Sequence, residues 1–149
     1  MVQPTQGVLD AAQIAKLIPH HGSMCLLASV LHYDTQSIRC LANSHRLLTN
    51  PLREHGMLHA VCGIEYAAQA MAVHGALLSG HGDKPPRGGR LASVRAVEFS
   101  VSRLDDVDAD LEICATQLMG DDNSMVYEFA VTAVAHTLLK GKATVVLVS

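Results

Sequence analysis

Charged residues are scarce in this sequence: they make up 17% of its 149 residues, whereas hydrophobic residues make up 49%. So few charges among so many apolar residues argue against a disordered chain. The formal net charge of −3 argues against binding to nucleic acid or to an anionic membrane surface. The length suits a single domain, 1–149, with a sizeable core. The surplus of apolar residues predicts a further buried surface, such as an interface between subunits.

The sequence also lacks the usual signals for membranes and for oxidising compartments. Its first residues, MVQPTQGVLD, contain no basic segment followed by an apolar run, so no signal peptide is expected. No uncharged apolar run is long enough to be more than an Ala/Gly-rich core helix. The 4 cysteines lie far apart without C-x-x-C spacing, which is typical of free thiols in a reducing environment. We therefore expect a cytoplasmic protein that does not bind membranes.

Motifs for common cofactors are absent as well. The chain contains no Ser-centred nucleophile elbow, no Walker loop and no dinucleotide fingerprint, so we expect no cofactor. His55, His59, Cys62 and Glu65 have a spacing that could ligate zinc. Gly56, however, argues against a continuous helix through His55, and no second ligand pair occurs elsewhere. We therefore expect no metal site.

Residue patterns predict a short helix, two strands, one long helix and four more strands. The short helix, AAQIAKLI, is opened by a capping pair of Asp10 and Gln13 and stopped by Pro19. The long helix runs from about His59 to Leu78. Alternating and β-branched residues predict the strands, with a turn at Lys140–Gly141–Lys142 before the last one. The six strands are expected at 24–33, 37–43, 90–101, 109–119, 124–139 and 143–149.

The long helix decides the fold class. Its centre, GIEYAAQAMAVHG, is apolar nearly all round, and such a helix is buried nearly all round. Its many alanines and glycines allow close approach to a curved sheet. We therefore predict an α+β fold in which a six-stranded, mostly antiparallel sheet wraps a long central helix. This element order resembles that of the hotdog fold.

Glu65 is the only formally charged side chain between Glu54 and Asp83, and it shares a helix face with Gln69. One interpretation is structural: an acid in the first helical turn favours the helix dipole and stays hydrated, or pairs with an arginine. The other is functional: a carboxyl group in an apolar cleft has a raised pKa and can serve as a general acid. The residues alone leave both interpretations open.

Two segments carry a resemblance to a known family. GIEYAAQAMA resembles the helix of the 3-hydroxyacyl-acyl-carrier-protein dehydratases of fatty acid synthesis, in which a Pro-Gly-Val-Leu turn leads to a Glu-Ala-x-x-Gln helix start. LIPHHGSMCLLASVL resembles their N-terminal Leu-x-Pro-His-x-x-Pro-(Phe/Met)-Leu-Leu-x-Asp-x-Val segment. The resemblance is closer to a dehydratase-like branch found in aryl-polyene biosynthesis clusters. Members of that branch have a run similar to the NPLR and GIEYAAQAMAVH segments of this sequence.

The resemblance implies a reaction and a set of residues. In the family, a histidine and an acid from opposite subunits of a dimer eliminate water from a 3-hydroxyacyl thioester, which gives a trans-2-enoyl thioester. It implies Glu65 as the acid and Gln69 as its supporting neighbour. A backbone N–H near Gly63, between Cys62 and Ile64, would polarise the thioester carbonyl. The implied substrate is an acyl thioester on acyl carrier protein or coenzyme A, and the implied assembly is a homodimer or higher oligomer.

The histidine departs from the family pattern. The catalytic histidine of the family opens a His-Phe-Pro motif fourteen residues before the acid, and here that position is Pro51. Three histidines could take its place. His55 lies in the loop before the helix, next to Gly56, which we expect near the substrate. His45 begins the same loop, and His20 matches the Pro-His of the N-terminal segment.

Other functions remain open at this stage. A hotdog thioesterase would use Glu65 to activate water against the thioester carbonyl. A non-catalytic hotdog subunit would pair with an active dehydratase and shape its acyl tunnel. A cluster of basic residues would suit an acidic carrier protein and its phosphopantetheine, or would simply protect an edge strand. Its members are Lys84, Arg87, Arg90, Arg95 and Arg103.

Overall fold

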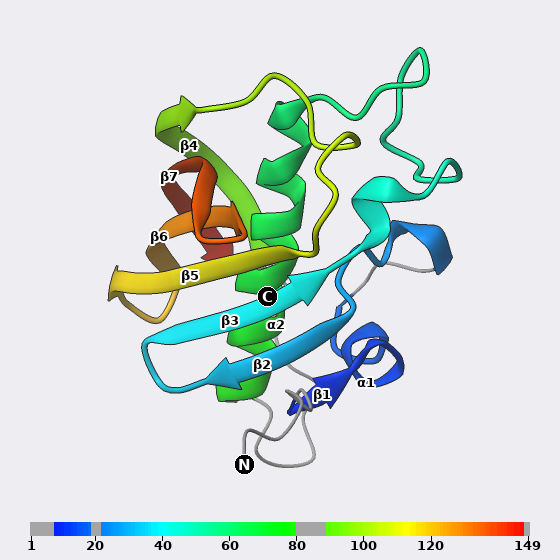
Figure 1. Ribbon diagram of the computed structural model, residues 1–149. Helices are drawn as coiled ribbons and strands as arrows, with labels where there is room; N and C mark the ends of the chain where they lie inside the picture. Colours follow the sequence, from blue (N-terminus) through cyan, green and yellow to red (C-terminus); the bar gives the residue numbers. More distant parts are fainter. Residues whose placement is uncertain (1–7, 19–21, 80–88, 148–149) are drawn as a thin grey trace.

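The computed structural model describes residues 8–18, 22–79 and 89–147, which form one antiparallel sheet wrapped around a long helix (Figure 1). The sheet has seven strands in the order β1-β2-β3-β5-β6-β7-β4. The strands are β1 (Leu9–Asp10), β2 (Ser29–Tyr33), β3 (Ser37–Ala42), β4 (Gly89–Phe99), β5 (Leu111–Gly120), β6 (Ser124–Ala133) and β7 (His136–Leu147). The helices are α1 (Ala11–Ala15) and α2 (Gly63–Ser79), with 3-10 turns at η1 (Gly22–Met24), η2 (Ser44–Arg46) and η3 (Ala60–Cys62).

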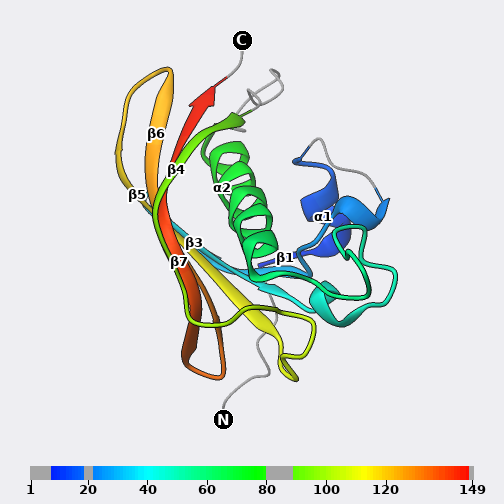
Figure 2. The same cartoon turned by 90° about the horizontal axis from the view of Figure 1, so that it is seen from above.

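Helix α2 lies in the concave side of the sheet, as its composition predicts. Figure 2 shows the sheet on one side of α2 and α1 on the other. The run Ala60–Ser79 is long and apolar enough to span a membrane by composition, but 50% of its most apolar window is buried inside this fold. Tyr66, Ala70 and Val73 are fully buried in the core. The apolar character of the helix is therefore explained by the sheet around it.

The short helix begins as the sequence predicts. The Asp10 carboxylate accepts a hydrogen bond from the Gln13 backbone N–H at 2.9 Å, and the Gln13 side chain accepts one from the Asp10 N–H at 2.9 Å. This reciprocal pair is a capping box. The preceding two-residue strand β1 pairs with β2, which gives the sheet a seventh strand that the sequence pattern did not reveal.

The predicted strand 124–139 and the predicted turn at 140–142 are wrong. The chain turns instead at Val134 and Ala135, whose φ angles are 48° and 64°, so β6 and β7 are joined by a two-residue loop. Both residues are in the left-handed region. A two-residue turn of this kind usually contains Asn or Gly, and this sequence has neither there. Gly141 lies inside β7 instead of in a turn. A glycine suits this position because a Cβ there would stand 3.0 Å from Phe129 Cζ and 3.0 Å from Val97 Cγ2.

The cysteines are free, as expected, although they differ in burial. Cys40 is buried in β3, and burial raises the pKa of its thiol to about 12. Cys25, Cys62 and Cys114 are half-buried. None of the four thiols takes part in a disulfide.

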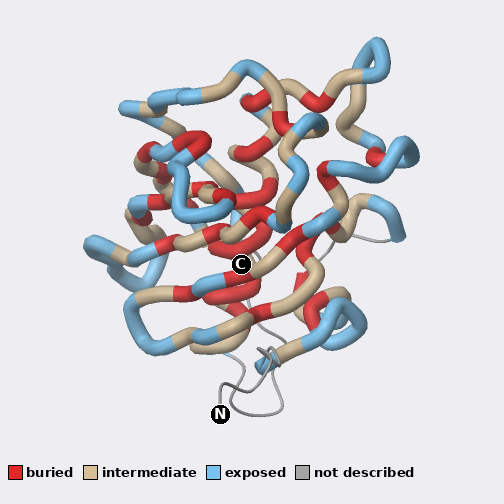
Figure 3. Tube along the Cα trace, in the orientation of Figure 1, coloured by how far each residue is buried: buried red, intermediate tan, exposed pale blue. Residues whose placement is uncertain are grey.

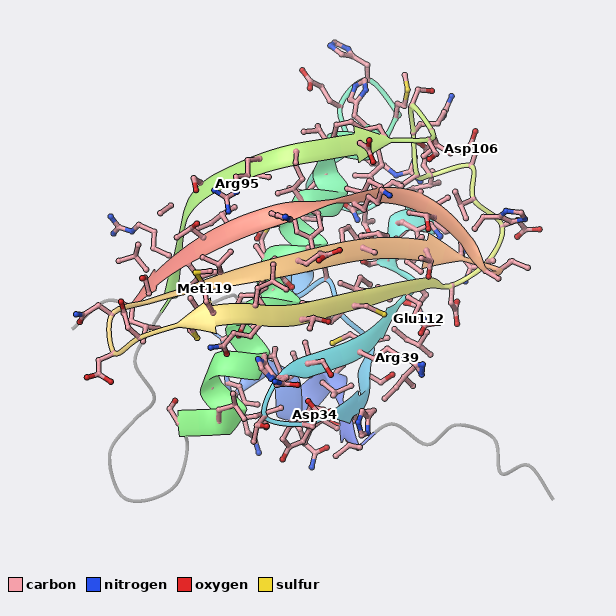
Figure 4. The ribbon with its side chains drawn as sticks, turned by 90° about the vertical axis from the view of Figure 1, so that its left-hand side faces the viewer. Asp34, Arg39, Arg95, Asp106, Glu112 and Met119 are labelled. Carbon is pink, nitrogen blue, oxygen red and sulfur yellow. The ribbon has the colours of Figure 1, made fainter. Side chains whose placement is uncertain are left out.

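Strand β4 forms one edge of the sheet. It pairs with β7 on one side only, and its register shifts near Ala96, where φ is 54° (Figure 4). Most of its residues are exposed, including Phe99, which is 47% exposed. Its apolar residues Leu91, Val94 and Val97 are only partly buried. An eleven-residue edge with this composition offers backbone and apolar groups to another chain.

A buried histidine connects α2 to the sheet. His74 is fully buried; its Nε2 lies 2.8 Å from the Asp34 carbonyl oxygen and its Nδ1 lies 2.7 Å from the Tyr127 hydroxyl. Because a carbonyl can only accept, Nε2 carries a proton. Burial lowers the pKa of the ring and so favours its neutral form, in which Nδ1 accepts from the Tyr127 hydroxyl, a group that also lies 3.8 Å from Met125 Sδ.

Two glycines of α2 should respond oppositely to alanine. A Cβ on Gly63 would stand 2.6 Å from Leu139 Cδ2, and Leu139 is fully buried, so Gly63→Ala should lower the free energy of unfolding by about 1–3 kcal/mol. A Cβ on Gly75 would meet only Met125 Cε at 3.9 Å, so Gly75→Ala should raise it by about 0.5–1 kcal/mol. Urea denaturation of both variants tests this, and equal effects would contradict the packing described.

Stability should fall below neutral pH because His74 is held neutral. Its pKa is lowered in the folded state, so its contribution is fully present above the unfolded value of 6.5 and is lost as pH falls below that value. Urea midpoints of the wild type should therefore drop between pH 7.5 and 5. His74→Gln should flatten this slope, whereas His32→Gln, at an exposed position, should not. A slope unchanged in His74→Gln would contradict the assignment.

Candidate active site

Glu65 lies in the first turn of α2 and is half-buried. An acid in this turn lies near the positive end of the helix dipole, as the structural interpretation requires. One carboxylate oxygen, Oε1, also accepts a hydrogen bond from Gln69 Nε2 at 3.4 Å. The structure thus joins the two residues that the sequence placed on one helix face.

Gln69 is fully buried and orients this contact. Its Oε1 accepts a hydrogen bond from the Leu26 backbone N–H at 2.9 Å, and its Nε2 donates to the Met24 carbonyl at 2.6 Å. These bonds fix which end of the amide faces Glu65. They also explain why β2 begins at Ser29 rather than at Met24 as expected, since a side chain and not a strand satisfies this backbone.

A second buried network joins α2 to the loop that precedes it. The Ser44 hydroxyl donates to the Leu26 carbonyl at 2.8 Å, so the Tyr66 hydroxyl, 2.8 Å away, donates to Ser44. Asn50 Nδ2 donates to the Tyr66 oxygen at 3.1 Å and to the Ser44 carbonyl at 2.9 Å. Burial raises the pKa of Tyr66. Sequence reasoning missed this network, and the Asn50–Pro51 turn signal was its only trace.

His45 is fully buried in η2. Its Nε2 donates to the Val107 carbonyl at 3.1 Å, so the ring is held with its proton on Nε2. Its Nδ1 is buried and has no hydrogen-bond partner among residues 8–18, 22–79 and 89–147. Burial is the main cause that lowers its pKa. The ring is therefore a neutral base enclosed by the chain.

His55 is exposed in a tight turn between Glu54 and Met57. His55 and Gly56 have φ angles of 52° and 75°, so both central residues of the turn are left-handed. Gly56 thus has a conformational role in the turn. His20, the third candidate, lies outside the described residues.

The start of the helix borders an apolar hollow. The N–H groups of Cys62 and Gly63 bond to the carbonyls of His59 and Ala60, within the 3-10 turn itself. Val61 is 56% exposed beside this turn. A hollow of about 370 Å³ opens here between the helix start and the end of β4. Its lining comprises His59, Ala60, Val61, Phe99, Val101 and Ser102.

The arrangement brings together an acid, a buried amide and an apolar surface at one end of α2. Two of the candidate histidines lie in the loop just before that end, one enclosed and one exposed. Within the described ranges, no group of three or more His, Cys, Asp or Glu side chains could hold a metal ion. The acid and the histidines of the loop can offer acid–base chemistry near the apolar hollow.

Comparisons with known proteins bear on the family and on the fold. The model of a family described as ApeP-like, ApeP dehydratase, matches residues 12–148. The dehydratase heterocomplex ApeI:P from Xenorhabdus doucetiae is similar in structure, with a TM-score of 0.82, 22% identity, and coverage of 91% of each chain. No curated protein sequence matches the chain.

Thioesterases are also among the structural neighbours. A hypothetical thioesterase with coenzyme A from Streptococcus pneumoniae has a TM-score of 0.60 and 11% identity, with 81% of this chain and 85% of that chain covered. A mutant thioesterase from Pseudomonas aeruginosa has a TM-score of 0.57 and 12% identity, with 80% of each chain covered. These likenesses confirm the predicted hotdog fold.

Removal of the Gln69 amide should weaken the structure around Glu65. Gln69→Leu leaves the Met24 carbonyl and the Leu26 N–H buried without their partner, so the free energy of unfolding should drop by about 2–4 kcal/mol. The matched control is Gln36→Leu at an exposed turn, with an expected change within about 0.5 kcal/mol. Urea denaturation compares them, and a neutral Gln69→Leu would contradict the role assigned to the amide.

Proposed function

The chain belongs to the ApeP-like dehydratase family, and on this premise we propose that it eliminates water from 3-hydroxyacyl thioesters on acyl carrier protein to give trans-2-enoyl thioesters. The observation that carries the proposal is the pairing of Glu65 with the buried Gln69 amide in the first turn of α2. This pairing supports a carboxyl group held in one orientation in the first helical turn, four residues after Val61, which lines the apolar hollow. Such a group can deliver a proton to a leaving hydroxyl.

The reaction needs one base and one acid. A histidine removes the proton from the carbon next to the thioester carbonyl. The C–H electrons form the new double bond as the C–O bond of the 3-hydroxyl breaks. The Glu65 carboxyl protonates the departing oxygen, and water leaves. No external oxidant or reductant is consumed.

We assign the base to His55 rather than to His45. An exposed imidazole on a tight turn is accessible to a bound thioester, whereas the His45 ring is enclosed and donates its N–H to the Val107 carbonyl. The assignment to His55 fits a site shared between two subunits, because the loop between β3 and α2 projects beyond the start of α2 (Figure 1). His20 remains the alternative.

We propose that two subunits join along β4. The strand is hydrogen-bonded on one side only, and its apolar residues Leu91, Val94 and Val97 are incompletely buried. A second hotdog subunit that added its own edge strand would satisfy this backbone and cover the hollow beside Phe99. A homodimer is the simplest such assembly.

Charge on the same edge supports docking of a carrier protein. Arg95 (Figure 4) and Arg90 are exposed on β4, whereas Arg103 is engaged with Asp105. An acidic carrier protein would be steered by such residues. Lys84 and Arg87, which complete the basic cluster of the sequence, lie outside the described residues.

A second candidate function is that of a subunit paired with an active dehydratase. The absence of a His-Phe-Pro motif at Pro51 favours it, and so does the similarity to a chain from a complex described as a heterocomplex. In that assembly the β4 edge would meet a different hotdog chain, and the base would come from the partner.

Hydration of a trans-2-enoyl thioester tests the proposed reaction in reverse, and it is monitored by the loss of enoyl absorbance. Glu65→Gln should lower the rate about 10²–10⁴-fold, since it removes the acid. The matched control is Glu112→Gln, whose carboxylate pairs with Arg39 at 2.8 Å on the outer face of the sheet, and its rate should be that of the wild type.

Three other outcomes contradict the proposal in different ways. Equal rates for the wild type and Glu65→Gln would remove Glu65 from the reaction. Release of free thiol without hydration would favour a thioesterase. An inactive pure protein that becomes active only with a second hotdog chain would favour the paired subunit.

A further inference from the structure

Arg53 lies in the loop between η2 and η3, and its side chain is only 11% exposed. Its Nε donates to the Leu47 carbonyl at 2.8 Å, one terminal nitrogen donates to the Gly56 carbonyl at 3.0 Å, and the other donates to the His45 carbonyl at 3.4 Å. One guanidinium thus bonds to two carbonyls at the start of the loop, those of His45 and Leu47, and to one near its far end, that of Gly56.

The buried charge of Arg53 is balanced nearby. A terminal nitrogen of Arg53 lies 3.9 Å from Asp105 Oδ2, and that side chain is 7% exposed. The hydrogen bonds that Asp105 accepts from Arg103 and from the Leu58 N–H hold the pKa of this carboxyl well below its usual range. Asp105 therefore stays ionised and makes a buried guanidinium tolerable.

Apart from Arg53, the loop is held by the Asn50 amide, which bonds to the Ser44 carbonyl and the Tyr66 hydroxyl, and by short backbone turns. Glu54 and Met57 exchange two backbone hydrogen bonds, at 2.9 and 3.0 Å, which close the turn around His55. A non-glycine residue in the left-handed region costs roughly 1–3 kcal/mol, so the turn needs support from its surroundings. The outer turns of the loop are exposed (Figure 3), and Leu48 is 86% exposed. The bond from Arg53 to the Gly56 carbonyl ties this turn back to the buried end of the loop.

We propose that Arg53 is a positioning residue that holds residues 45–57 as one rigid arm and thereby fixes the His55 imidazole for proton removal. The inference rests on the proposed function, since it assigns Arg53 a part in the same site. A guanidinium presents its donors in a fixed planar fork, so it can bond to three carbonyls in set directions. A lysine has one donor atom and cannot reach all three.

Arg53→Lys tests the proposal, because it keeps the charge near Asp105 and removes the fork. The kcat for enoyl-thioester hydration should fall about 10–100-fold, the loss expected when a reacting group is misplaced by about 1 Å. KM should stay within about threefold, since substrate binding is not altered. The matched control is Arg46→Lys in the same loop: that guanidinium bonds to the exposed Asp110 carboxylate at 2.8 Å, and its variant should behave as the wild type.

Amide hydrogen exchange gives a second readout that needs no activity. In the Arg53→Lys variant, the backbone amides of residues 45–57 should exchange faster than in the wild type, and those of α2 should exchange at the wild-type rate. In Arg46→Lys, the exchange rates of both segments should be unchanged. Unchanged exchange within 45–57 overturns the proposal, whether or not the protein hydrates thioesters. Faster exchange with an unchanged kcat also overturns it, because the arm would then not position a reacting group. An inactive wild type counts against the proposed function, and exchange alone then decides whether Arg53 holds the arm.

Discussion

The hydrogen bonds between the Gln69 side chain and the backbone of Met24 and Leu26 are the interaction on which the candidate site depends. Helix α2 is apolar almost throughout, and apolar contacts alone would not select its rotation against the segment that leads into β2. A buried amide does select it, because leaving either backbone group unpaired costs free energy. The same amide then presents its N–H to Glu65. The acid is therefore oriented by a bond pattern that the fold needs for its own stability.

Around this fixed acid the loop between β3 and α2 is organised by polar side chains instead of by regular structure. Tyr66, Ser44 and Asn50 bind its first part to the helix, and Arg53 binds its turns to one another. The exposed edge strand β4 ends at Phe99, which lines the hollow at the start of α2. A second hotdog subunit on this edge would enclose the acid and meet the projecting loop. The proposed chemistry and the proposed assembly are thus two consequences of one arrangement.

The sequence predicted the long helix, the capping box and most strands, because each is encoded by local periodicity. It did not predict the turn at Val134 and Ala135, since neither residue favours the left-handed region. It assigned Gly141 to a turn, whereas that glycine avoids a clash inside β7. The contact between Glu65 and Gln69 could be predicted because their spacing places them on one face of a helix. Arg53 and Asp105 were not, because the contact between them joins distant parts of the chain and the other Arg53 bonds lie within an irregular loop, so neither leaves a periodic trace.

The central claim is that Glu65 of one subunit works with His55 of the other. A dimer that combines one Glu65→Gln chain with one His55→Ala chain, purified by two different tags, tests it directly. If the two residues come from opposite subunits, one of the two equivalent sites keeps both groups, so the mixed dimer should recover about half of the wild-type hydration rate. Each parent homodimer should remain inactive. A mixed dimer as inactive as its parents would contradict the claim.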